Sequence, residues 1–376
     1  MERPPHSSIL RRSNLVGALG VALMACGSAA SSVSPRADGG DAGITLTTQL
    51  PEDAGRDAAR DAAPTAVYKP VAPIVPAHQA TSHGPYPIVL MHGMGGFNEL
   101  ANLPLTVSYF NGVQADLKAH GEPEVFVTVA PPFNTSEVRA QSLAPQLDAI
   151  LKETGADKLN LIGHSQGGMD ARVLVSAAGL GYGNRVASVT TVATPHLGTK
   201  VADLALGLVS GPLSGVESDA VDAFLGLLQQ GVYSIQSNPE LLAQVTQLST
   251  SYMATTFNPK YKDDPNVVYA SYAGRTNLEN GESDCDDAVY ANQPGALDVP
   301  QPELQPTASY LQLEGETSDG LVPVESAKWG TFMECEPADH LKEVGLLFQN
   351  GADPISGFDH LVFFRNIVAR LRAQGF

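Results

Sequence analysis

The sequence predicts an α/β fold in which a mostly parallel central sheet is flanked by helices. From residue 86 onward, short apolar segments typical of buried strands alternate with longer segments that have the period of helices. Glycine-rich turns directly follow two of these strands, at residues 92–96 and 163–168. Strands that alternate with helices are joined by right-handed crossovers, which makes the sheet parallel. Ligands of such sheets bind at the carboxyl ends of the strands, where both turns fall.

Length and charge narrow the range of functions. The chain has 376 residues, enough for one large domain or two ordinary ones. Its 40 acidic and 22 basic side chains give a net charge of −18 at pH 7. A nucleic acid would be repelled by such a surface, so nucleic acid is excluded as a partner.

The N-terminus is typical of an export signal. Arg11 and Arg12 precede an apolar run over residues 14–25, which is far too short to span a bilayer. The run ends in the sequence LMAC, which resembles a bacterial lipobox, where the cysteine is acylated and becomes the mature N-terminus. Residues 1–26 are therefore predicted to be a lipoprotein signal peptide, with the lipid on Cys26.

The predicted anchor sets the expected location. Because the residue directly after Cys26 is not an aspartate, the protein is expected to be exported and attached to the outer membrane or cell surface. The alternative is an ordinary signal peptide with an incidental cysteine.

Composition changes at the start of the apolar segments. Residues 27–84 are rich in Ala, Asp, Gly, Ser and Pro and show no apolar period, which predicts a flexible linker. Residues 85–376 are predicted to form the folded domain. Two cysteines remain there, Cys285 and Cys335, and an exported protein favours a disulfide between them. Two free buried thiols are the alternative.

Periodicity predicts the elements of this domain. In residues 137–156, Leu143, Leu147 and Ile150 share one face at helical spacing. Further helices are predicted in 168–179 and 361–374, with short helices in 201–215 and 218–235. Strands are predicted in 86–91, 124–133, 158–162, 186–196, 267–274 and 308–315.

A G-x-S-x-G pattern carries the main chemical signal. Gly163 and Gly167 flank Ser165, with a predicted strand before the pattern and a predicted helix after it. Small flanking residues permit the sharp turn that projects a serine hydroxyl above a sheet. The helix start also places Ser165 beside a positive dipole end. Ser165 is therefore the predicted nucleophile.

A serine nucleophile needs a base and an orienting acid later in the chain. We expect His340 to be the base and Asp319, in a turn after the predicted strand 308–315, to be the acid. His360 is the alternative base, but it falls in the final helical pattern, where it would pack or cap.

The oxyanion of a tetrahedral intermediate needs two backbone donors. We expect these to be the amide of Gln166, directly after the nucleophile, and that of Met94 in the first glycine-rich turn. The alternative for residues 92–96 is an ordinary strand-to-loop turn.

Residues 159–199 closely resemble the bacterial triacylglycerol lipases of the Pseudomonas and Burkholderia type, and residues 86–96 and 318–344 match in order and spacing. The resemblance implies an α/β-hydrolase fold and gives the triad roles to Ser165, Asp319 and His340. It assigns the oxyanion amides to Met94 and Gln166. It also implies a mobile helical lid over about 198–232, for which a packed helical hairpin is the alternative, and makes a dedicated foldase a candidate partner.

The chain departs from this family at its structural calcium site. Asp298 matches one of the two ligand aspartates, but the second position, two residues after His340, holds Lys342. Because an ammonium would repel the ion, no cofactor or metal is expected. We expect Lys342 to pair with Asp298 instead.

The resulting hypothesis is a serine hydrolase that cleaves carboxylic esters through an acyl-enzyme on Ser165, with triacylglycerols as the leading substrate. A carboxylesterase for short soluble esters is the nearest alternative. The third is a non-catalytic surface lipoprotein with the same fold.

Overall fold

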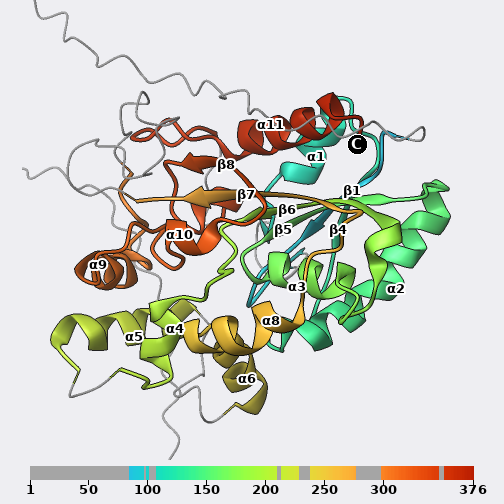
Figure 1. Cartoon of the computed structure of the whole chain (residues 1–376). Coiled ribbons are helices and arrows are strands. Elements are labelled where there is room, and N and C mark those ends of the chain that lie inside the picture. The colour runs from blue at the N-terminus through green and yellow to red at the C-terminus, as the bar shows by residue number, and fades with distance from the viewer. Residues whose placement is uncertain are drawn as a thin grey trace, which may run out of the picture. The chain divides into compact units, whose positions relative to one another are not determined.

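The computed structural model (Figure 1) describes residues 84–96, 99–100, 107–209, 213–227, 238–276, 298–346 and 351–376. The predicted signal peptide, 1–26, lies outside the described residues, as does the predicted linker, 27–84, apart from its last residue. Among the helices that are described, none has both the length and the apolar character needed to cross a bilayer.

A six-stranded sheet lies at the centre of the domain, and every neighbouring pair of its strands is parallel. The strand order is β4-β1-β5-β6-β7-β8. The strands are β1 (Ile88–Met91), β4 (Val125–Thr128), β5 (Leu159–His164), β6 (Val186–Val192), β7 (Val268–Gly274) and β8 (Thr331–Glu336). Two short strands, β2 (Glu99–Leu100) and β3 (Val107–Ser108), form a separate antiparallel pair. The predicted parallel α/β fold is confirmed.

Helices cover both faces of the sheet (Figure 1), which is why every residue of the inner strands β1, β5 and β6 is buried. In β1, Ile88 and Leu90 pack in one apolar cluster, while Val89 and Met91 pack in another. The first cluster includes residues of α1 (Val113–Ala119) and α11 (His360–Ala373), and the second includes residues of α2 (Ser136–Thr154) and α3 (Gln166–Val175).

Helix α2 confirms the prediction made from its apolar period. Leu143, Leu147 and Ile150 are all buried. The side chain of Thr135 caps the first turn, and Gly155 ends the helix with a left-handed φ of 69°. The predicted C-terminal helix is likewise confirmed as α11.

The strand predicted over 308–315 is wrong, because this segment lies in helix α9 (Gln305–Leu313). Its short alternation of apolar and polar residues fits either period, and tertiary packing decides between them. Helix α9 packs against α5 (Gly215–Leu227), and its residues Ala308 and Leu311 are buried, while Leu313 is 71% exposed. The edge strand β8, which the sequence did not predict, follows α9 and takes the place beside β7.

The predicted lid region, 198–232, contains α4 (Lys200–Ala205) and α5 (Gly215–Leu227). Residues 210–212 and 228–232 lie outside the described part of the chain. Phe224 of α5 and Leu204 of α4 are buried in the same apolar cluster. A lid movement therefore stays a prediction.

The remaining described elements connect these layers. They are the 3₁₀ turns η1 (Tyr182–Arg185) and η4 (Lys342–Val344), the π-helical η3 (Met253–Phe257), and the helices α6 (Pro239–Gln247), α7 (Thr250–Tyr252), α8 (Asn258–Lys260) and α10 (Val324–Ala327).

Candidate active site

Ser165 lies in a strained turn between β5 and α3. Its backbone has φ 54° and ψ −130°, a left-handed conformation that an L-residue with a side chain rarely adopts. Such strain persists only where the surrounding structure enforces it, and it is found mainly at functional sites. The turn is the strand-to-helix bend that the G-x-S-x-G pattern predicts.

The flanking glycines are required by close backbone contacts. A Cβ on Gly163 would lie 2.5 Å from the Gly168 nitrogen, and one on Gly167 would lie 2.2 Å from the Met91 carbonyl oxygen. Both distances are too short for a real Cβ. The pattern is therefore explained by packing of the turn against itself and against the end of β1.

Asp319 and His340 are brought together, although 20 residues separate them in the chain. The His340 Nδ1 lies 2.7 Å from the Asp319 Oδ2. The other carboxylate oxygen accepts hydrogen bonds from the amides of Leu321 and Val322, at 2.8 and 2.7 Å. Because Asp319 is fully buried and held on both oxygens, it fixes the orientation of the imidazole.

The His340 ring lies beside the strained turn. Its centroid is 4.6 Å from that of the His164 ring, and His164 directly precedes Ser165. Among the described contacts, no hydrogen bond joins the Ser165 hydroxyl to His340. Hydrogen bonds of this kind often align only in the substrate complex.

His360, the alternative base, makes a hydrogen bond outside the candidate active site. It is the first residue of α11, and its Nε2 is hydrogen-bonded to the Asn111 carbonyl oxygen at 2.7 Å. It is buried and packs where the helical pattern placed it.

The predicted oxyanion turn approaches the nucleophile closely. A Cβ on Gly93 would lie 2.7 Å from the Ser165 Cβ. Gln166 is the first residue of α3, and the amide of a first helical residue has no acceptor within its helix. The amides of Met94 and Gln166 thus belong to the two segments that flank Ser165.

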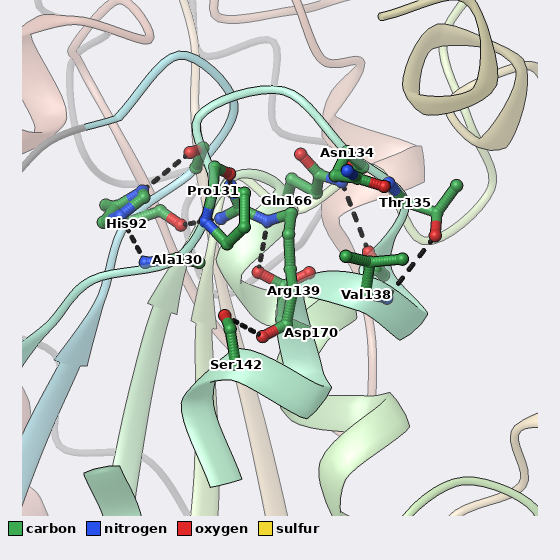
Figure 2. Close-up of polar contacts among 12 residues, drawn as sticks. His92, Ala130, Pro131, Asn134, Thr135, Val138, Arg139, Ser142, Gln166 and Asp170 are labelled. Atoms are coloured by element: carbon green, nitrogen blue, oxygen red, sulfur yellow. Dashed lines mark hydrogen bonds and ion pairs between the residues drawn. The ribbon is translucent and has the colours of Figure 1, made fainter. Parts of the chain in front are cut away.

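A buried arginine, not predicted from the sequence, connects this turn to two helices (Figure 2). Arg139 Nε donates to Asp170 Oδ2 at 2.8 Å, and its two terminal nitrogens donate to the carbonyl oxygens of Pro131 and His92, each at 2.6 Å. Both charged side chains are fully buried. A signal was present, because Arg139 lies four residues before Leu143 on the apolar face of α2.

The His92 ring also supports the turn. Its Nε2 accepts from the Ala130 amide at 3.0 Å. Burial, and then the charge of Arg139, lower the pKa of His92 to about 4. His92 is therefore neutral at neutral pH, as an acceptor requires.

A second set of buried polar contacts, not predicted from the sequence, surrounds His164, the residue directly before Ser165. His164 Nε2 is 2.9 Å from Glu343 Oε2, and His164 Nδ1 is 2.7 Å from the Tyr109 hydroxyl. Burial, followed by the nearby His340, lowers the pKa of His164 well below its ordinary value. Burial, followed by the charge of Asp319, raises the pKa of Glu343 well above its ordinary value. Both shifts favour neutral forms, so the contact is a buried hydrogen bond that anchors the end of β5.

The residues present do not fit a calcium ion at the position that the family resemblance implies. The Lys342 ammonium donates to Asp298 Oδ1 at 2.5 Å and to the Val299 carbonyl oxygen at 2.8 Å. An ammonium already occupies the place between these oxygens, and it would repel a second cation. Within the described residues, the group with metal-ligating geometry is His164, His340 and Glu343. His164 is hydrogen-bonded to Glu343, and His340 is hydrogen-bonded to Asp319.

The predicted lipidation and disulfide sites are only partly described. Cys26 and Cys285 lie outside the described residues. Cys335 lies in β8 and is buried.

Known proteins resemble this chain in sequence. Residues 86–260 match the family model of the α/β-hydrolase fold. A triacylglycerol lipase of Vibrio cholerae is 33% identical over 302 residues, which cover 77% of this chain and 88% of that protein. Triacylglycerol lipases of Pseudarthrobacter phenanthrenivorans and Burkholderia plantarii are each 35% identical over 174 residues, or 45% of this chain. The chain spans about half the length of these last two relatives, 52% and 46%.

Solved structures share the fold. The mature form of a Bacillus licheniformis lipase aligns with 79% of this chain and 96% of its own, with a TM-score of 0.51 and 21% identity.

Proposed function

Because the chain belongs to the bacterial triacylglycerol lipases of the α/β-hydrolase superfamily, we propose that it hydrolyses carboxylic esters through an acyl-enzyme, with acylglycerols as substrates. The triad is Ser165, Asp319 and His340. The observation that supports these roles best is the 2.7 Å contact between His340 and a fully buried Asp319, beside the strained turn of Ser165.

The geometry suits acyl transfer in two steps. The Ser165 hydroxyl attacks the ester carbonyl while His340 Nε2 takes its proton, and Asp319 stabilises the resulting imidazolium. The amides of Met94 and Gln166 donate to the oxyanion. The intermediate collapses when His340 returns the proton to the leaving alcohol. Water then attacks the acyl-enzyme, with His340 again as base, and releases the carboxylic acid and free Ser165.

Exposed apolar side chains favour a lipid substrate over short soluble esters. Leu197, Leu208 and Leu213 are exposed in or beside the predicted lid. On a lid that opens, such side chains would meet the acyl chains of a lipid substrate. In this proposal the segment 198–232 moves to expose the site to lipid.

We further propose export and attachment to the outer membrane or cell surface through lipid on Cys26, and a Cys285–Cys335 disulfide. These rest on the signal-like N-terminus and on the oxidising environment that an exported protein meets. The mass of the N-terminal peptide from membranes tests the lipid, and non-reducing peptide mapping tests the disulfide. Refolding of denatured protein to full activity without a helper would exclude a required foldase.

The experiment that tests the activity is labelling with a fluorophosphonate, followed by peptide mapping. The label is expected on Ser165 and not on the Ser165→Ala variant. Full esterase activity in that variant would overturn the assignment, and a protein that neither labels nor hydrolyses esters would favour a non-catalytic lipoprotein.

Substrate class is tested with p-nitrophenyl esters from acetate to palmitate, below and above micelle formation. The rate is expected to rise with chain length and at the interface. A preference for acetate with no interfacial gain would identify a carboxylesterase instead.

A further inference from the structure

One buried ammonium is surrounded by three buried aspartates next to the His340 loop. Lys342 Nζ lies 2.5 Å from Asp298 Oδ1, 3.2 Å from Asp353 Oδ2 and 3.8 Å from Asp339 Oδ2. The Lys342 side chain is only 5% exposed. These four residues are called the Lys342 cluster below.

The ammonium is fully satisfied where it lies. It has three N–H donors. Acceptors for them are Asp298 Oδ1, the Val299 carbonyl oxygen and Asp353 Oδ2. This arrangement fixes Lys342 in one position, between segments that are distant in the chain.

The charge balance of the cluster requires this cation. Burial alone would lower the pKa of Lys342, but Asp298, followed by Asp339 and Asp353, raises it overall. Burial opposes the charged form of Asp298 and raises its pKa, whereas the charge of Lys342 and its hydrogen bond favour that form. Three carboxylates share one ammonium, and its loss would leave Asp298 and Asp339 buried without the charge that offsets theirs, which is strongly destabilising.

The cluster is connected to the proposed catalytic base through the backbone. Asp339 directly precedes His340, and its Oδ1 accepts from the amides of Leu341 and Lys342 at 3.0 and 2.9 Å. Its Oδ2 accepts from the Gln301 amide at 2.8 Å. The segment that carries His340 is therefore held to residues 298–301 by the same group of charges.

Asp353 extends these links to the C-terminal helix. Its Oδ1 accepts from the amides of Ile355 and Ser356, at 2.8 and 2.9 Å, in the turn before α11. Lys342 therefore joins three segments: 298–301, 339–344 and 353–358.

We propose that Lys342 is a positioning residue, whose ammonium serves as a permanent internal counter-ion and holds the His340 loop in place without a divalent cation. A metal ion at such a position would be lost to a chelator, whereas the ammonium is part of the chain. The stability of this loop is then independent of calcium.

The test begins with the wild-type protein, so it does not depend on whether a variant folds. Calcium titration calorimetry and thermal unfolding in EGTA and in millimolar CaCl₂ are compared. We expect no binding heat and the same Tm in both solutions. Saturable calcium binding that raises the Tm, or a Tm that falls in EGTA and returns with calcium, would overturn the proposal.

Two variants test the role of the charge. Lys342→Met is expected to lower the Tm by about 5 °C or more, since it removes the positive charge that offsets the buried carboxylates. It should also lower kcat with little change in KM, because His340 shifts while the substrate surface is intact. Lys342→Asp supplies an oxygen ligand in place of the cation, and its Tm and kcat are expected to rise with CaCl₂ but not with NaCl.

Lys200→Met is the matched control, because Lys200 also contacts two carboxylates, those of Glu314 and Glu316, but is partly exposed. Its Tm should change by less than about 2 °C. An unchanged Tm and kcat in Lys342→Met, or no response of Lys342→Asp to calcium, would refute the role of Lys342. The kcat measurement rests on the proposed function, whereas the thermal and calorimetric measurements do not, so failure of one is distinguishable from failure of the other.

Discussion

Gly93 lies so close to Ser165 that a Cβ added to the glycine would be 2.7 Å from the Ser165 Cβ. The same Cβ would be 2.7 Å from the Tyr109 hydroxyl. The two glycine-rich turns are therefore in direct contact at the carboxyl ends of β1 and β5, which the sequence only suggested. This contact brings the Met94 amide towards the place where an oxyanion would form.

Gly93→Ala is expected to lower kcat by about 100-fold, because the methyl group must displace either the oxyanion turn or the nucleophile. Steady-state hydrolysis of p-nitrophenyl butyrate measures the effect. Gly121→Ala is the control, since Gly121 has a positive φ of 98° but no atom within 4 Å of an added Cβ. It should lower the Tm and leave kcat unchanged. Equal kcat in both variants would contradict the close contact.

Asp319→Asn is expected to lower kcat by about 10³- to 10⁴-fold. The amide would no longer hold His340 in the tautomer that accepts the serine proton, nor stabilise the imidazolium. Asp116→Asn is the control, because Asp116 pairs with Arg365 on the helices α1 and α11 and should leave kcat as it is. A kcat within twofold of wild type for Asp319→Asn would remove Asp319 from the triad.

Arg139→Met is expected to lower the free energy of unfolding by about 3–5 kcal/mol, because it leaves Asp170 buried without its partner. Urea denaturation measures the change. Asp170→Leu should lower the free energy of unfolding by a similar amount. The double variant should lower it by less than the sum of the two, since it leaves no buried charge without a partner. Additive losses would show that the pair is not coupled.

His92→Gln is expected to make stability less sensitive to acid. His92 titrates near pH 6.5 when unfolded and near pH 4 when folded, so the unfolded state takes up the proton first as the pH falls. Wild-type protein should therefore lose up to about 3 kcal/mol of stability between pH 6.5 and pH 4 that the variant does not lose. Urea midpoints across this range give the difference. The exposed His120→Gln should keep the wild-type slope, and equal slopes in all three proteins would contradict the assignment.

The pattern of apolar residues in the sequence was sufficient to predict helices that bury a single apolar face and strands that lie wholly inside the sheet. Helix α2 follows from its apolar period and strand β5 from its short, largely apolar run, because each presents apolar residues to neighbours on the expected sides. The segment 308–315 could not be assigned this way. Its apolar residues fit a strand as well as a helix, and only packing against α5 decides for α9.

The sequence by itself determined the bend at Ser165, because the glycines around it, the preceding strand and the following helix are all neighbours in the chain. It also placed Asp319 and His340 in one segment of the domain. Tertiary structure alone decided which side chains meet across long separations: Arg139 with the His92 carbonyl, His164 with Glu343, and Lys342 with Asp353. Such contacts depend on burial, since a charge or hydrogen-bonding group must find a partner once water is excluded, and the partner is set by how the segments pack.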